Sequence, residues 1–188
     1  MPLTVEAVAI QGVLLVKSDV HADERGWFAE VYRAGALAGV GISEVFTQDN
    51  VSWSERRGTL RGLHLQRPPS AQGKLIRCLR GSIFDVVLDV RPGSATEGTW
   101  TSVQLVASSG ESLWIPAGLA HGFQTLVDDC LVLYKTTADY DPAHEAGIRW
   151  DDPALAIPWP VRPPILSPRD AGLPLAADAA TSFRANVR

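Results

Sequence analysis

The sequence predicts an all-β domain, either a sandwich or a barrel. Between residues 8 and 137 the chain is dominated by short segments in which apolar and polar residues alternate, and Gly or Pro clusters separate many of them. Only one internal stretch has a helical pattern. Period-two alternation is typical of strands with unlike faces, and regularly spaced strands without intervening helices favour a sandwich or barrel over alternating βα units.

The strand with the clearest pattern is IFDVVLDV (83–90), in which four apolar residues share one face while Asp85 and Asp89 share the other. The remaining strands are predicted at 8–16, 61–66, 74–80, 101–106, 112–116 and 130–137. RAGALAGVG (33–41) predicts a short helix, and the tail 173–188 predicts one more. The proline-rich segment WPVRPPILSPRD (159–170) is expected to lie extended over the surface, because proline removes ladder donors and blocks helix.

Length and composition indicate one globular domain, 1–188, with 46% hydrophobic and 20% charged residues. The net charge of −4 argues against nucleic acid as a partner, and the absence of a long uncharged apolar run argues against a membrane. The first residues lack the pattern of a signal peptide, and the two cysteines are too few and too far apart for a disulfide scaffold. We therefore expect a cytoplasmic protein with free thiols.

The stretch RGLHLQ (61–66) raises the question of what its polar face contacts. Leu63 and Leu65 share one face of the predicted strand, so Gly62, His64 and Gln66 share the other. That second face is either solvent-exposed or lines a polar cavity.

Two spaced motifs refine the predicted fold. The pattern G-x5-H-x-Q starts at Gly58, and G-x5-P-x-G-x2-H starts at Gly110, with about fifty residues of strand pattern separating the two motifs. Together they resemble the signature motifs of the cupin jelly roll, a double-stranded β-helix with a few short helices. Metal-binding cupins carry a second histidine where this chain has Gln66, and Lys74 would repel a cation. We expect no metal and no cofactor.

Three side chains suggest proton-transfer chemistry at such a cavity. The imidazole of His64 is suited to accept a proton at neutral pH. If that proton is α to a carbonyl, Lys74 could stabilise the enolate oxygen. Tyr134 is a candidate to return the proton from the opposite side.

Six blocks, in order, resemble the dTDP-4-dehydrorhamnose 3,5-epimerase family and cover nearly all of residues 8–170, leaving a tail at 171–188. They are DERGWFAEVY (23–32), TQDNVSWSERRGTLRGLHLQ (47–66), AQGKLIRCLRGSIFDVVLDVRPGSATEGTW (71–100), LWIPAGLAHGF (113–123), LYKTTADYDPAHEAGIRWDDP (133–153) and ILSPRD (165–170). The resemblance implies a homodimer that epimerises C3 and C5 of dTDP-4-dehydro-6-deoxy-D-glucose, a dTDP-linked 4-keto-6-deoxy sugar, to dTDP-4-dehydro-L-rhamnose. It implies no metal or cofactor in that reaction.

The resemblance also implies roles for individual residues. His64 would be the general base, Asp170 the carboxylate that orients it, Lys74 the enolate stabiliser and Tyr134 the acid on the opposite face. Nucleotide binding, in combinations that cross the subunit interface, is implied for Arg25, Phe28, Glu30, Gln48, Asn50, Arg61, His121, Tyr140 and Glu145.

Other functions remain open from the sequence. Epimerisation of a single carbon, C3 or C5, as in antibiotic-sugar synthesis, would use the same residues. A metal-dependent cupin oxygenase or isomerase, and a non-catalytic dTDP-sugar binding protein, are alternatives of another class.

Overall fold

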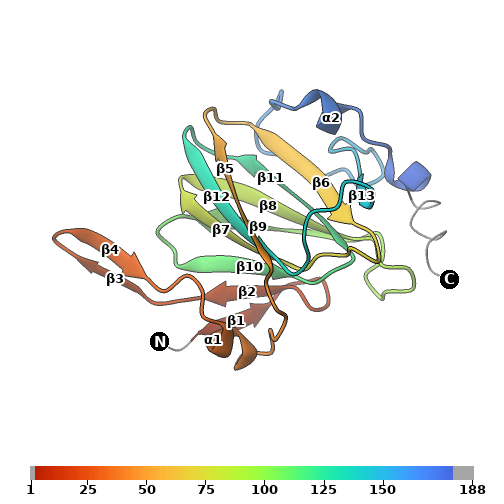
Figure 1. Ribbon diagram of the computed structural model, residues 1–188. Helices are drawn as coiled ribbons and strands as arrows, with labels where there is room; N and C mark the ends of the chain where they lie inside the picture. The colour runs from red at the N-terminus through yellow and green to blue at the C-terminus, as the bar shows by residue number, and fades with distance from the viewer. Residues whose placement is uncertain (1–2, 180–188) are drawn as a thin grey trace.

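The computed structural model describes residues 3–179, which form two antiparallel sheets packed face to face, with a hairpin that projects from them (Figure 1). One sheet contains β1 (Thr4–Ala7), β2 (Leu14–Lys17), β10 (Glu111–Ile115), β7 (Lys74–Arg80), β12 (Cys130–Thr136) and β5 (Gln48–Ser54), in that order. The other contains β13 (Glu145–Gly147), β6 (Leu60–Gln66), β11 (Leu119–Thr125), β8 (Ser82–Asp89) and β9 (Trp100–Val106). The hairpin is β3 (Val20–Asp23) with β4 (Gly26–Ala29). The predicted all-β fold is confirmed.

An apolar cluster fills much of the space between the two sheets. It includes Ile76 and Val132 from the six-stranded sheet, and Val87, Leu105 and Phe123 from the five-stranded sheet. Each of these side chains is at most 4% exposed. Burial of this much apolar surface is the main force that holds the two sheets together.

The five-stranded sheet is buried on its outer face as well. Val86 and Leu88 pack there against Leu155, Ile157 and Trp159, so the apolar face predicted for 83–90 lies under the C-terminal part of the chain rather than between the sheets. The opposite face, which carries Asp85 and Asp89, points into the interior, and both aspartates are fully buried. The predicted division of the strand into two faces is correct, but neither face is mainly solvent-exposed.

The proline-rich segment lacks helix up to Ser167, as predicted, and pairs with the sheet through a parallel bridge between Thr59 and Ile165. It is not wholly a surface segment, because Trp159 is only 3% exposed. The prediction is wrong for its last three residues, which begin the short helix α2 (Pro168–Ala171). Proline is tolerated in the first turn of a helix, and the Ser167 hydroxyl caps that turn.

The two helical predictions are correct in part. Helix α1 (Ala34–Ala38) lies within 33–41. Of the helix predicted at 173–188, residues 173–175 are not helical, 176–179 are helical, and 180–188 lie outside the described residues. Strands β1, β3, β4, β5, β11 and β13 were not predicted, and the strand predicted at 8–16 is observed only from Leu14 onward. Within 3–179 no helix is long and apolar enough to cross a membrane.

Candidate active site

A polar cavity occupies the part of the interior that the apolar cluster leaves open. It has two adjoining parts of about 350 and about 310 Å³. Five side chains line both parts: His64, Lys74, Tyr134, Tyr140 and Glu145. The cavity is therefore large enough for a small organic ligand and has several groups that can exchange protons.

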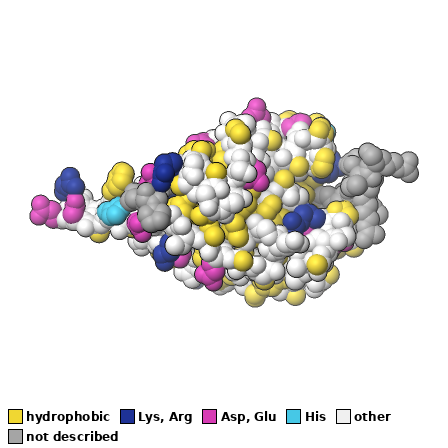
Figure 2. Space-filling view, turned by 90° about the horizontal axis from the view of Figure 1, so that it is seen from below, with side chains coloured by type: hydrophobic (Ala, Val, Ile, Leu, Met, Phe, Trp, Pro, Cys, Tyr) yellow, Lys and Arg dark blue, Asp and Glu magenta, His cyan; other side chains and the backbone are white. Residues whose placement is uncertain are grey.

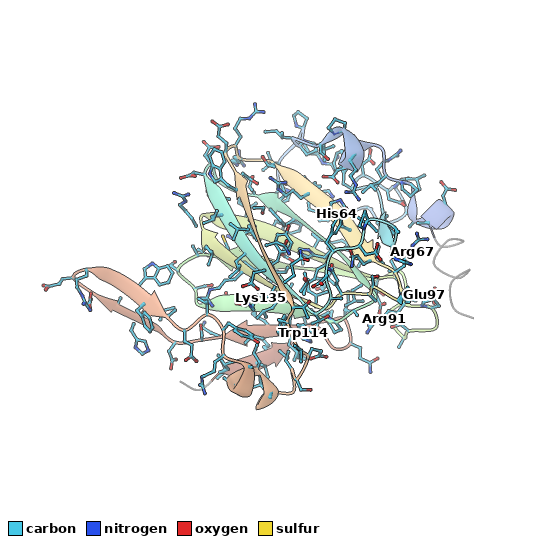
Figure 3. The ribbon with its side chains drawn as sticks, in the orientation of Figure 1. His64, Arg67, Arg91, Glu97, Trp114 and Lys135 are labelled. Atoms are coloured by element: carbon cyan, nitrogen blue, oxygen red, sulfur yellow. The ribbon has the colours of Figure 1, made fainter. Side chains whose placement is uncertain are left out.

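The cavity collects most of the residues predicted for the site. Those that line it are His64, Lys74, Tyr134, Asp170, Gln48, Asn50, Arg61, His121, Tyr140 and Glu145. They come from strands of both sheets, from the loop before β13 and from helix α2. His64 lies on β6, on the side of the molecule away from the projecting hairpin (Figure 3).

The His64 imidazole is paired with a carboxylate. Its Nε2 lies 2.6 Å from an oxygen of Asp170, which α2 places 106 residues further along the chain. Burial opposes ionisation of Asp170, but the hydrogen bond and charge of His64 outweigh it and hold the pKa of that carboxyl below its ordinary value. An ionised Asp170 accepts a hydrogen bond from Nε2–H, which leaves Nδ1 as the basic nitrogen of a neutral ring.

An irregularity in β6 brings Arg61 and His64 into the same cavity. In strict alternation these residues would point to opposite faces of the sheet. The pairing of β6 with β11 shifts register between the pairs His64–His121 and Arg61–Phe123, so both side chains point inward. Gly62 makes the shift possible, because its φ is +118° and a Cβ there would lie 2.5 Å from the Cα of Gly122.

Lys74 begins β7 and is only 9% exposed. Its Nζ donates a 3.1 Å hydrogen bond to the backbone oxygen of His64. Burial lowers the Lys74 pKa to about 8, although Asp85 and Glu145 partly oppose that shift. The ammonium is therefore present at neutral pH, and burial increases its effect on any oxyanion in the cavity.

Tyr134 lies on β12, in the sheet opposite to that of His64, and lines the same cavity. Burial raises the pKa of its hydroxyl, with Arg61 opposing and Glu145 adding to the shift. The phenol thus keeps its proton at neutral pH and can act as an acid. A ligand between the two sheets would have His64 on one side and Tyr134 on the other.

A second histidine–aspartate pair lies beside the first. His121 is opposite His64 on β11, and its Nε2 is 3.0 Å from both oxygens of Asp85 on β8. The two side chains are 9% and 0% exposed. Asp85, which no motif singled out, fixes the orientation of the His121 ring at the cavity wall.

Tyr140, Glu145 and Arg169 form a hydrogen-bonded group at the cavity. The Tyr140 hydroxyl donates to a Glu145 oxygen at 2.5 Å, and Arg169 forms an ion pair with the same oxygen. Burial opposes ionisation of Glu145, but these two partners hold the pKa of its carboxyl below the ordinary value. The group combines an exposed aromatic ring with a cation, which together suit a nucleotide base and its phosphates.

Several cavity residues were not predicted. They are Leu65, Gln66, Gln72, Phe123, Thr136, Ser167 and Arg169. Arg169 and Ser167 lie within ILSPRD, beside Asp170, so proximity in sequence was a usable signal. Gln66 was visible as the unusual residue of the first motif. The others carry no local signal, because only the packing of the two sheets brings them to the cavity.

Three predicted residues lie outside the cavity. Arg25, Phe28 and Glu30 belong to the projecting hairpin and the segment after it, and Phe28 is 66% exposed. Arg25 pairs with Asp23 at the hairpin tip, whereas Glu30 pairs with Arg33. Figure 2 shows the hairpin as a narrow arm that carries charged and hydrophobic side chains away from the body of the molecule. Within one chain these residues cannot contact a ligand bound between the sheets.

The donor set does not suit a metal ion. Among residues 3–179 no three His, Cys, Asp or Glu side chains are grouped closely enough to hold one. The second histidine position of the cupin motif is Gln66, whose amide is already hydrogen-bonded to three backbone groups.

The chain is similar to characterised sugar-nucleotide epimerases. Residues 7–178 match the family model described as dTDP-4-dehydrorhamnose 3,5-epimerase. The enzyme of that name from Sinorhizobium fredii is 45% identical over 95% of this chain and 92% of its own length. A dTDP-4-dehydrorhamnose 3-epimerase from Streptomyces niveus is 39% identical over 92% of this chain and 83% of its own.

A solved structure is similarly close. The crystal structure of the 3,5-epimerase from Legionella pneumophila in complex with dTDP-4-keto-L-rhamnose superimposes with a TM-score of 0.87 and 40% identity. The match covers 92% of each chain. Sequence and structure comparisons therefore agree over nearly the whole chain.

Proposed function

The chain belongs to the dTDP-4-dehydrorhamnose 3,5-epimerase family, and on that premise we propose that it epimerises dTDP-4-dehydro-6-deoxy-D-glucose at C3 and C5 to dTDP-4-dehydro-L-rhamnose. The observation that carries the proposal is the position of His64 and Tyr134 on opposite sheets of one cavity. A base and an acid on opposite sides of a carbon invert its configuration.

The steps follow from the geometry. The free nitrogen of His64 removes the proton from a carbon α to the C4 ketone, and the electron pair forms an enolate at the C4 oxygen. The Lys74 ammonium stabilises that oxygen. Tyr134 then donates its proton to the opposite face of the carbon, and solvent restores the protonation states of His64 and Tyr134. The same sequence at the second α carbon completes the reaction.

Asp170 supports the base throughout this cycle. Its carboxylate holds the His64 ring in one orientation and stabilises the imidazolium that forms after proton abstraction. We assign nucleotide binding to Gln48, Asn50, Arg61, His121, Tyr140 and Glu145, together with Arg169, which the sequence did not predict. Arg61 and Arg169 suit the diphosphate, and the exposed ring of Tyr140 suits the thymine base.

The test is incubation with the keto sugar in heavy water, followed by NMR of the product. We expect deuterium at both C3 and C5. Deuterium at one carbon only would identify a single-carbon epimerase, a possibility that the 3-epimerase relative supports. If no exchange occurs while dTDP still binds, the chain is a binding protein and the proposal is wrong.

We further propose that the protein acts as a homodimer in which the hairpin of one protomer covers the cavity of its partner. The support is that Arg25, Phe28 and Glu30 lie outside the cavity of their own chain. Val51 and Trp53 on the edge strand β5 are 60% and 54% exposed and offer apolar surface for the contact.

Mixing two variants tests this arrangement. His64→Ala and Arg25→Ala should each be impaired alone, whereas a hybrid dimer contains one site with an intact His64 and an Arg25 from the partner. Activity regained on mixing supports contribution across the interface. No gain above the sum of the separate variants, with hybrid dimers verified by mass spectrometry, contradicts it.

We also propose that residues 1–188 act as one domain in the cytoplasm. Cys78 and Cys130 are buried free thiols, which is consistent with a reducing compartment. Cell fractionation with an antibody against the native protein tests the location.

A further inference from the structure

Gln66 is the motif residue to which the proposed reaction gives no role. It ends β6 and is 4% exposed. Its Nε2 donates to the backbone oxygens of Ser70 at 2.7 Å and Asp139 at 3.1 Å. Its Oε1 accepts from the backbone N–H of Asp141 at 2.6 Å. Both ends of the buried amide are therefore bonded to backbone.

Two other glutamines hold the same stretch of backbone. The Gln48 Oε1 accepts from the N–H of Tyr140 at 2.8 Å, and the Gln72 Nε2 donates to the oxygen of Ala138 at 2.7 Å. We call Gln48, Gln66 and Gln72 the glutamine clamp. Together they bond to the backbone of four consecutive residues, 138–141.

The clamped residues begin the loop that carries Tyr140 and leads to Glu145, both of which line the cavity. Glu145 is itself paired with Gln66 across the strands β13 and β6. If the loop became ordered only when the ligand binds, the conformational entropy lost by the loop would weaken binding. A loop that is already held in place loses little entropy on binding, so the affinity is not reduced in this way.

We propose that Gln66 is a positioning residue that preorganises the 138–145 loop for nucleotide binding. The inference rests on the proposed function, because it takes Tyr140 and Glu145 as contacts of the dTDP group. Gln66 acts through these two residues, since its own amide hydrogens and oxygen are used on the backbone.

Only an amide can make all three of these hydrogen bonds. It donates two protons from one end of the side chain and accepts one at the other. A carboxylate of the same shape accepts but cannot donate, so it would face two carbonyl oxygens without a proton between them. A protonated carboxylic acid recovers one of the two lost donors. A glutamate at position 66 should therefore disturb the loop most at high pH, where its carboxyl is ionised, and less at low pH, where the carboxyl is protonated.

The experiment compares Gln66→Glu with Gln124→Glu by calorimetric titration with dTDP between pH 5.5 and 8. Gln124 is a matched control because it is also buried and also holds a loop, with hydrogen bonds of 2.9 Å to both backbone groups of Val161. It does not line either part of the cavity.

For Gln66→Glu we expect dTDP to bind about tenfold more weakly than to the wild type at pH 8. The ratio should shrink as the pH falls and the new carboxyl gains a proton. The KM for the sugar nucleotide should rise while kcat stays within about threefold of the wild type. Gln124→Glu should lose thermal stability but keep the dTDP affinity of the wild type at every pH.

Two results overturn the inference. One is a Gln66→Glu variant that binds dTDP as the wild type does, and the other is a Gln124→Glu variant with an equal, pH-dependent loss. If Gln66→Glu does not fold, Gln66→Met replaces it, and unchanged affinity there has the same meaning.

A further measurement needs no variant. In the wild type without ligand, the amides of Tyr140 and Asp141 should exchange slowly with deuterium; fast exchange would contradict preorganisation. A wild type that neither binds dTDP nor exchanges substrate protons would instead refute the proposed function, and the inference with it.

Discussion

The two histidine–aspartate pairs of the cavity have different constructions. His121 and Asp85 lie on neighbouring strands of one sheet, with both carboxylate oxygens 3.0 Å from the ring and side chains that are 9% and 0% exposed. His64 uses one oxygen of Asp170 at 2.6 Å, and its side chain is 28% exposed. Asp170 comes from α2, which belongs to neither sheet.

The difference indicates that the two pairs have different functions, one in proton transfer and the other in fixed hydrogen bonding. A ring that must accept a proton and release it again needs access to substrate and solvent, and His64 has that access. A ring held by both carboxylate oxygens in a closed setting is suited to fixed hydrogen bonding instead. We therefore expect substitutions in the His64 pair to affect turnover and those in the His121 pair to affect binding and stability.

The largest effect is expected for His64→Ala. Loss of the base should lower the rate of deuterium incorporation at both carbons about 10³-fold, a typical contribution of general base catalysis. Calorimetry should find dTDP binding within about twofold of the wild type, because the residues assigned to the nucleotide are untouched. Equal loss of rate in His121→Ala would remove the distinction between the two histidines.

Asp170→Asn should reduce kcat by about 10²-fold, because the amide no longer stabilises the imidazolium or selects its tautomer. The matched substitution Asp85→Asn should reduce kcat by less than about tenfold. Steady-state kinetics measured for both variants under the same conditions give the two kcat values, and their ratio tests the proposed difference between the two pairs. A larger loss in Asp85→Asn would assign the proton transfer to His121.

The pH profile tests the role of Lys74, the cation that lines the cavity together with both histidines. Because the Lys74 pKa is lowered to about 8, the ammonium is present below that pH and is lost above it. We therefore expect kcat/KM to fall on the alkaline side of about pH 8, approaching a tenfold loss per pH unit. Lys74→Arg keeps its charge at high pH, so the alkaline decrease in kcat/KM should move to higher pH. If the decrease stays near pH 8, it belongs to the titration of another group.

The smallest effect is expected on stability. Asp85→Asn should lower the Tm by about 5 °C, since one hydrogen bond to a buried, charged acceptor is lost in a protein of this size. Differential scanning calorimetry measures this shift, and Asp170→Asn should shift the Tm less. The reverse order would mean that the pair with the exposed histidine is the structural one.

Much of the site was predictable because its signals are local. Period-two alternation placed Gly62, His64 and Gln66 on one polar face; His64 and Gln66 do line the cavity, whereas Gly62, where the strand is irregular, does not. The two motifs and the six family blocks predicted the fold and the family, and the structure and the comparisons confirm both. The missed β3–β4 hairpin has short strands with mostly exposed side chains, so it lacks the alternating pattern that predicts a strand.

The sequence by itself determined which residue types stand on which face of a regular strand, because side-chain alternation is a property of the local backbone. Only the tertiary structure decided that Arg61 joins His64 inside the cavity, because that depends on a register shift against β11. Packing also brought Asp170 to His64 and the amide of Gln66 to the 138–145 loop. These contacts join segments far apart in the chain, and their geometry depends on how two sheets and a helix pack rather than on any local pattern.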